Sequence, residues 1–487
     1  MRRLTLLLVA AATALVTSLP LVAQARRSID QLQHDIDAIL GAPVLQRGFW
    51  GVHIKPVDGA DVWYSRNADK LMMPASTLKI VTLAAAADRL GWDFRYETRV
   101  YADGQIRAGV LHGDLIVAGA GDPSLDDWDG IATRLWSGWA TQLKAAGISA
   151  IDGRIVGDDN AFEDEGLGAG WAWDDIPTGF AAPTSALQFN EGNVQVRLAP
   201  GDAVGERAIA TLAPDTSAMT LTSFIVTGPA GSAGTVVRRR LPGSSRLELH
   251  GSLPLRGRPF SMNASVDNPT LYYVRALRAA LIADGITVSG PAVDIDEITP
   301  QPRHDTLMPL ITSQSDPLSV LATTMMKLSQ NQYAEAMLKT IGAGTIEAGR
   351  TAVKETLKAW NIDPAGLIQL DGSGLSRYNY VTPETMTSVL LHVGRSERLR
   401  AVYESTLPIA GRDGTLEQRM RGTGAEGRAF VKTGSMNNVR SAAGYARTAD
   451  NRLVAFTIIA NNFDNSSAVI NAATDEIIAR IATYRER

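Results

Sequence analysis

The chain has 487 residues, an apolar share of 45% and no cysteine. This length favours more than one domain, and the absence of cysteine excludes disulfides, thiolate metal sites and a cysteine nucleophile. The formal net charge is −4, without the basic surplus of a nucleic-acid-binding protein, and the six histidines lack the HExxH and HxH spacings of zinc hydrolases.

The pattern of the first residues indicates a targeting segment rather than part of the folded domain. Arg2 and Arg3 precede an apolar run that begins at Leu4, and Ala23-Gln24-Ala25 fits the small-residue pattern of a cleavage site. This order is typical of a secretory signal peptide over residues 1–25. The alternative is a membrane anchor, but the apolar run is short and polar sequence follows at once. Export of a chain without cysteine suits a bacterial envelope, so we expect the protein in the periplasm.

Patterns at the two ends of the chain predict a single sheet to which both ends contribute. Apolar residues recur at helical or alternating spacing, and Asp58-Gly59 is a hairpin signal. The expected elements are helices at 28–40, 76–90 and 468–484 and strands at 48–57, 60–65, 441–447 and 453–460.

The middle of the chain has a different composition. Glycine, valine, aspartate and proline are frequent, and short β-like runs recur around one helical stretch at 131–146. This composition predicts a mainly β insertion. Helical periodicity then returns at 318–328, 332–341, 349–360 and 382–393.

The first candidate for chemistry is Ser76-Thr77-Leu78-Lys79 at the start of a predicted helix. Residues three apart share a helical face, so Ser76 and Lys79 point into the same space. A serine hydroxyl needs a base to become a nucleophile, and a lysine whose pKa is lowered by burial is such a base. The apolar flanks suit a half-buried lysine. Alone, however, the pattern also fits a helix cap with a solvated lysine.

The second candidate is Ser329-Gln330-Asn331, which falls between two predicted helices. Serine and asparagine commonly cap helices, and capping alone explains them here. In the functional interpretation Ser329 relays a proton, and Asn331 donates or accepts a hydrogen bond from substrate or Lys79.

The third candidate, Lys432-Thr433-Gly434-Ser435, ends an apparent strand. Gly434 leaves room for a close backbone, and Lys432 and Thr433 can hold a carboxylate, although an ordinary strand end has the same composition. Three independent chance matches in this order are not expected, so the motifs together predict one site.

This set resembles the S-x-x-K, S-x-N and K-T-G motifs of the penicillin-interactive serine acyltransferases. The long interval after the first motif is similar to the class C low-molecular-mass penicillin-binding proteins, the D-alanyl-D-alanine carboxypeptidase/endopeptidase family (DacB type, peptidase S13). The stretches 113–125, 371–377, 407–416 and 432–445 also resemble that family. One departure is Gln330, where aspartate or asparagine is more usual.

The resemblance implies an α/β transpeptidase/β-lactamase-like domain, an antiparallel sheet flanked by helices, with a large mainly β insertion that forms two smaller domains. We expect the catalytic domain at 26–97 and 303–487. One inserted domain is expected at 98–122 and 205–302, and the other at 123–204.

The resemblance also implies a mechanism. Ser76 attacks the carbonyl between two D-alanines while Lys79 takes its proton, and the backbone N–H groups of Ser76 and Ser435 form the oxyanion hole. Ser329 passes a proton to the leaving amine, and water then hydrolyses the acyl-enzyme. Neither a metal nor an organic cofactor is implied.

For substrate binding, the resemblance implies that Asn331 orients the substrate amide and that Lys432, Thr433, Gly434 and Ser435 hold the terminal carboxylate. The implied partners are peptidoglycan peptides that end in D-Ala-D-Ala, with β-lactams as inhibitors and no membrane anchor after signal cleavage.

Two alternatives stay open. A β-lactamase would need rapid deacylation, for which no Glu-x-x-x-Asn pattern stands out. A catalytically idle wall-binding protein would not need all three motifs intact. The loop Asp371 to Arg377 either forms a capped turn or borders the cleft.

Overall fold

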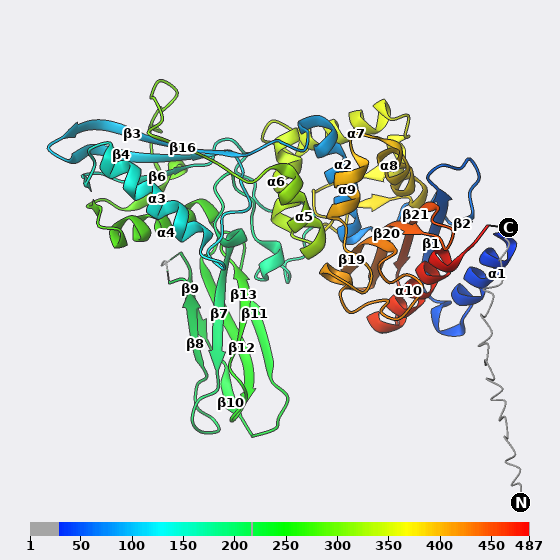
Figure 1. The fold of residues 1–487 in the computed structure, drawn as a ribbon. Helices are drawn as coiled ribbons and strands as arrows, with labels where there is room; N and C mark the ends of the chain where they lie inside the picture. The colour runs from blue at the N-terminus through cyan, green and yellow to red at the C-terminus, as the bar shows by residue number, and fades with distance from the viewer. Residues whose placement is uncertain (1–28, 216–217, 487) are drawn as a thin grey trace, which may run out of the picture.

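The computed structural model describes residues 29–215 and 218–486 (Figure 1). The signal peptide expected over residues 1–25 lies outside these ranges. Among the residues described, no helix is both long and apolar enough to cross a membrane.

The two ends of the chain meet in one five-stranded antiparallel sheet with the order β19-β20-β21-β1-β2. β1 from near the N-terminus pairs along its whole length with β21, from Phe49 opposite Asn461 to Pro56 opposite Val454. The strands are β1 (Phe49–Pro56), β2 (Tyr64–Arg66), β19 (Ala429–Met436), β20 (Val439–Arg447) and β21 (Leu453–Asn461).

Helices cover both faces of this sheet, and alternate side chains of β21 show how. Phe456 and Ile458 pack with α1 (Ile29–Leu40) and α10 (Ser467–Thr483), whereas Ala455 and Ile459 pack toward α2 (Lys79–Leu90) and α8 (Pro383–Arg395). Because successive strand residues point to opposite faces, a strand buried on both sides is apolar throughout.

The remaining helices of this half surround α2. They are α5 (Leu318–Leu328), α6 (Asn331–Ile341), α7 (Ile346–Ala359) and α9 (Arg400–Thr406), with a small hairpin of β17 (Leu367–Ile368) and β18 (Tyr380–Val381). The architecture confirms the predicted α/β class, an antiparallel sheet flanked by helices.

The inserted part contains a seven-stranded mixed sheet with α3 (Ile131–Ala145) and α4 (Pro269–Ala283). Its strands are β3 (Glu97–Arg107), β4 (Val110–Gly119), β5 (Ala150–Ile151), β6 (Ile155–Asp158), β14 (Thr287–Val288), β15 (Ala292–Asp294) and β16 (Ile311–Gln314).

Two smaller sheets project away from the seven-stranded sheet as an elongated unit (Figure 1). One sheet has the order β13-β7-β8, and in the other β12 joins β10, β11 and β9. The strands are β7 (Asn193–Ala199), β8 (Ile209–Ala213), β9 (Thr220–Ser223), β10 (Val226–Gly228), β11 (Thr235–Arg239), β12 (Arg246–Pro254) and β13 (Phe260–Ser265).

Sheet pairing groups the insertion differently from the expected segments. β5 and β6 pair with β4 and with β14 and β15, although we expected residues 123–204 to form a part of their own. These pairings are parallel and join residues far apart in sequence, which local patterns do not reveal. Where the domain boundaries fall stays a prediction.

Helix α4 is a second difference, because the composition predicted only one helix in the insertion. Its start carries signals that explain it: the Asn268 side chain accepts a hydrogen bond from Leu271 N, and Pro269 occupies the first helical position.

Candidate active site

Ser76 lies in a tight 3-10 turn (η2, Ala75–Leu78) that leads directly into α2. Ala75 has a left-handed backbone with a φ of 47°, which is uncommon for a residue other than glycine. Thr77 Oγ1 holds the turn by donating to Pro74 O at 2.7 Å. The turn therefore presents Ser76 at a fixed, strained corner in front of the sheet.

Lys79 is fully buried one turn after Ser76. Its Nζ lies 3.1 Å from Ser76 Oγ, 2.6 Å from Asn331 Oδ1 and 2.9 Å from Ser373 O. Burial lowers the pKa of Lys79 to about 7, against the opposing influence of the Glu335 and Asp371 carboxylates. The expected face-sharing of Ser76 and Lys79 is present.

The second motif occupies the junction between α5 and α6. Ser329 ends α5 in a left-handed conformation (φ 63°, ψ 34°), and Asn331 begins α6. Asn331 accepts from Lys79 through Oδ1 and donates from Nδ2 to Phe180 O at 2.7 Å. Both polar atoms of this side chain are thus committed, which fixes its orientation.

The third motif lies on β19, one of the two edge strands of the sheet. Lys432 is fully buried, and its Nζ donates to Ser329 Oγ at 2.8 Å and to Thr433 O at 2.7 Å. Burial and the nearby Lys79 lower the pKa of Lys432 well below its usual value. The Thr433 hydroxyl lies 2.9 Å from that of Thr415.

Gly434 is where β19 and the Ser76 turn touch. A Cβ added at Gly434 would lie 2.6 Å from Pro74 O and 3.0 Å from Ser76 N, so a side chain would push the strand away from the turn. The structure therefore brings all eight predicted site residues to one place, with Ser435 next to Gly434 and exposed at the site.

These residues surround a cavity of about 410 Å³. Its lining is Ser76, Asp175, Phe180, Ser329, Asn331, Gly374, Leu375, Arg377, Thr415, Thr433, Ser435, Met436, Asn437 and Arg440. A larger hollow of about 970 Å³, between α8 and the turn before β17, contains none of the motif residues. The smaller cavity is therefore the candidate site.

The loop from Asp371 to Arg377 has both of the roles that the sequence left open. Asp371 is fully buried and accepts hydrogen bonds from Gly374 N at 2.8 Å and Ser376 N at 2.6 Å, so the loop is a capped turn. Gly374, Leu375 and Arg377 also line the cavity, so the same loop borders the cleft. The sequence marked this loop by its two glycines, by Asp371 as a capping residue and by its resemblance to the family.

The inserted part also reaches the cavity. Asp175 and Phe180 line it, and Trp171 Nε1 donates to Asp371 Oδ2 at 2.9 Å. No motif pointed to these three residues, because their contribution depends on contacts between segments far apart in the chain.

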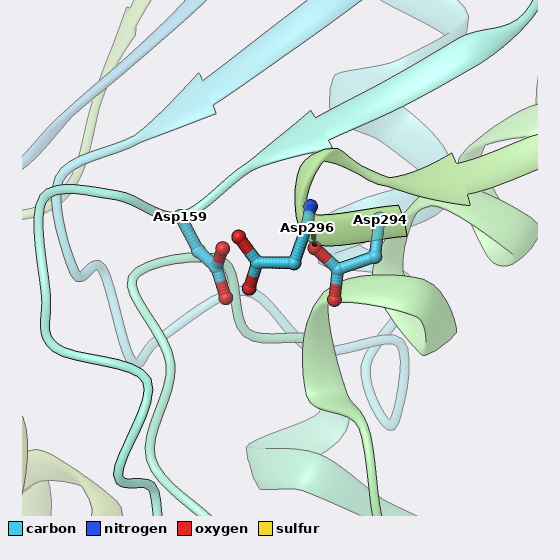
Figure 2. A group of neighbouring side chains, drawn as sticks. All are labelled: Asp159, Asp294 and Asp296. Atoms are coloured by element: carbon cyan, nitrogen blue, oxygen red, sulfur yellow. Dashed lines mark hydrogen bonds between the residues drawn. The ribbon is translucent and has the colours of Figure 1, made fainter. Parts of the chain in front are cut away.

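One group of carboxylates lies outside this site. Asp159, Asp294 and Asp296 of the inserted part place ligand atoms within 4.8 Å of one another (Figure 2). Asp159 accepts from Ser185, and Asp294 accepts from Asn268 Nδ2 at 2.7 Å, so much of this polar capacity is used within the chain. None of the three lines the cavity at Ser76.

Comparison with known proteins places this geometry in a family. The model of the D-Ala-D-Ala carboxypeptidase 3 (S13) family matches residues 32–484. The D-alanyl-D-alanine carboxypeptidase of Actinomadura sp. (strain R39) is 35% identical over 94% of this chain and 85% of its own length.

Two solved structures show the same fold. That of penicillin binding protein 4 from Haemophilus influenzae is 27% identical, with a TM-score of 0.81 over 93% of this chain and 99% of that one. The same protein complexed with a β-lactam is 26% identical, with a TM-score of 0.74 over 93% and 99%.

The chain thus belongs to the D-Ala-D-Ala carboxypeptidase 3 (S13) family of serine peptidases, which confirms the family predicted from its motifs. The predicted penicillin-binding-protein fold is confirmed as well.

Proposed function

We propose that the chain is a serine-type D-Ala-D-Ala carboxypeptidase and DD-endopeptidase that acts on peptidoglycan stem peptides through an acyl-enzyme on Ser76. The single observation that carries this proposal is the 3.1 Å contact between Lys79 Nζ and Ser76 Oγ. Family membership supports the same reaction class.

The hydrogen bonds of Lys79 support its role as the base. Asn331 Oδ1 and Ser373 O are acceptors without hydrogens, so each takes one hydrogen from Lys79 Nζ. A neutral amine has only two hydrogens, and its lone pair then faces Ser76. In this state Lys79 accepts the serine proton as the hydroxyl attacks the carbonyl.

Hydroxyl groups with a buried lysine behind them support recognition of a peptide that ends in a carboxylate. Thr433 and Ser435 line the cavity, and the buried Lys432 Nζ donates to Ser329 Oγ and to Thr433 O. A bound carboxylate adds the negative charge that favours the ammonium form of Lys432. Ser329, held by Lys432, then passes a proton to the leaving amine.

The oxyanion hole is assigned to the backbone N–H groups of Ser76 and Ser435. Support comes from the close approach of β19 to the turn at Gly434 and from the fact that Ser76 and Ser435 both line the cavity. Fixed donors of this kind stabilise the negative oxygen of a tetrahedral intermediate.

The proposal also includes where the mature protein is located and which compounds inhibit it. Residues 1–25 carry the pattern of a signal peptide, so we assign the mature protein to the periplasm. Penicillins, which resemble the D-Ala-D-Ala end, would leave a persistent acyl group on Ser76. A related structure contains a β-lactam, which supports this expectation.

A labelling experiment tests the proposal. A fluorescent penicillin should label the wild type and leave a stable adduct, and a peptide ending in D-Ala-D-Ala should lose its last residue, as read by mass spectrometry. Ser76→Ala should abolish both, whereas Ser405→Ala on the exposed side of α9 should change neither. Rapid release of the label would favour a β-lactamase, and no label on the wild type would remove the enzymatic assignment.

A further inference from the structure

Helix α6 carries a buried carboxylate, Glu335, one turn after Asn331. Residues four apart share a helical face, so Glu335 points the same way as Asn331. Glu335 is only 2% exposed. A buried carboxylate in this place requires partners, because an isolated buried charge is costly.

The partners of Glu335 are two backbone N–H groups of the loop behind Lys79. Gly372 N donates to Oε2 and Ser373 N donates to Oε1, both at 2.8 Å. The carbonyl of the same Ser373 accepts from Lys79 Nζ at 2.9 Å. Glu335 therefore connects to Lys79 through one residue of rigid loop.

We propose that Glu335 is a positioning residue for acylation of Ser76: its carboxylate fixes the Gly372–Ser373 backbone so that Lys79 directs its lone pair at Ser76, and its charge offsets the burial of Lys79. This inference rests on the proposed function, in which Lys79 is the base. One face of α6 then supplies or fixes both carbonyl acceptors of Lys79, through Asn331 and through Ser373.

The charged groups around Glu335 and Lys79 determine whether loss of the Glu335 charge raises or lowers the pKa of Lys79. Asp371 lies beside both Glu335 and Lys79, Lys432 faces Lys79 from β19, and Lys339 faces Glu335 from the same helix. Burial and Asp371 raise the pKa of Glu335 to about 7. Without the Glu335 charge, burial acts on Lys79 with less opposition, and the pKa of Lys79 falls further.

Glu335→Gln tests this role with a side chain of the same shape. The amide presents an N–H₂ group to a backbone N–H donor, so one hydrogen bond to the loop is lost. Below the pKa of the base, the rate of penicillin acylation falls as the pH falls, and this part of the pH profile is its acidic limb. In Glu335→Gln we expect the acidic limb to lie about one pH unit lower than in the wild type. The plateau rate should fall about tenfold, because a weaker base accepts the serine proton less readily.

Two further variants separate charge from loop position. Thr82 Oγ1 donates to Gly372 O at 2.7 Å, so Thr82→Val loosens the same loop without changing a charge. Thr82→Val should slow acylation but leave the acidic limb at the same pH as in the wild type. Glu335→Asp keeps the charge but shortens the reach, and its limb should stay near that of the wild type while its rate falls.

A direct titration of Lys79 makes the test independent of activity. With isotope-labelled lysine, the Cε signal that disappears in Lys79→Met reports the pKa in wild type and in Glu335→Gln. A lower value in Glu335→Gln supports the inference; an unchanged value, or an equal shift in Thr82→Val, overturns it. Failure of the wild type to acylate would instead overturn the proposed function, while the titration still decides the role of Glu335.

Discussion

Lys79 shows how a single side chain acquires its chemistry from its surroundings. It is fully buried, yet its Nζ contacts two carbonyl-type oxygens and one hydroxyl rather than a carboxylate. Burial disfavours the ammonium form, and the negative charges of Glu335 and Asp371 oppose this effect without a hydrogen bond to Lys79 Nζ. The pKa of about 7 that results is suited to a base at neutral pH.

The first prediction is a pH dependence of acylation. Burial lowers the pKa of Lys79 from 10.5 to about 7, so the neutral, proton-accepting form disappears as the pH falls below that value. The second-order rate of acylation by a fluorescent penicillin should fall about tenfold per pH unit below about 7 and level off about one unit above it. Stopped-flow measurements at constant ionic strength would show the limb.

Lys79→Arg is the matched control for this limb. Arginine keeps the positive charge but does not lose its proton in proteins, so acylation should be absent throughout the same pH range. A wild-type rate that is flat across the range, or a limb near the ordinary lysine value, would contradict the assignment of Lys79 as the base.

Sequence patterns predicted the motif residues because each motif is local. Ser76 and Lys79 are one turn apart, and their shared face follows from helix geometry alone. Glu335 and Phe180 had no such signal. Glu335 contacts Ser373 and Phe180 contacts Asn331, and in each case the two residues lie far apart in sequence. The type of a residue therefore predicts its chemistry only where its spacing along the chain also predicts which residues lie next to it.

At the scale of elements, the inserted part reaches the catalytic part through a polar strap, residues 163–191. Gln332 of α6 is buried in this contact; it accepts from Thr184 Oγ1 at 2.8 Å and donates to Ala182 O. Lys339 Nζ donates to Glu165 O at 2.9 Å further along the same helix. The strap thus follows the helix that carries Asn331.

The second prediction concerns this strap. Gln332→Met keeps the volume but leaves the Thr184 hydroxyl and the Ala182 carbonyl without their buried partner. Unsatisfied buried polar groups cost about 1–3 kcal/mol each, so the loss of two partners should lower the free energy of unfolding by about 2–6 kcal/mol. Denaturant unfolding followed by tryptophan fluorescence measures it. Gln418→Met, at an exposed position, should leave the midpoint unchanged, and an equal loss in both variants would contradict the role of the strap.

Elements were predicted best where they are local and least where they pair at a distance. The helix at 318–328 and the strand at 453–460 were expected within a residue of α5 and β21, because periodicity alone defines them. The parallel pairs of β6 with β4 and β15 join segments from three parts of the insertion. Short β-like runs carry no information about which partner they take.

At the scale of the whole molecule, the apolar cores are separate. Within the described residues, two large clusters draw on residues 32–96 and 318–484, and a third draws on residues 100–311. Of the buried apolar clusters in the described part of the chain, the one with members from both halves is small and consists of Phe162, Ala186 and Ala336. Because polar contacts dominate the connection, each half carries its own hydrophobic stabilisation.

The third prediction follows from this separation. Leu247 is fully buried in the core of the inserted part, and Leu247→Ala should cost about 2–5 kcal/mol through lost burial and an unfilled cavity. Differential scanning calorimetry should resolve two transitions, of which this variant lowers only the one that belongs to the inserted part. Penicillin acylation of the folded variant should proceed at the wild-type rate, since Leu247 does not line the cavity at Ser76.

Leu390→Ala is the reciprocal variant, because Leu390 of α8 is equally buried in the catalytic core. It should lower the other transition and leave that of the inserted part in place. If either variant moved both transitions together, the two halves would unfold as one cooperative unit. The polar strap, rather than the separate apolar cores, would then determine how the molecule unfolds.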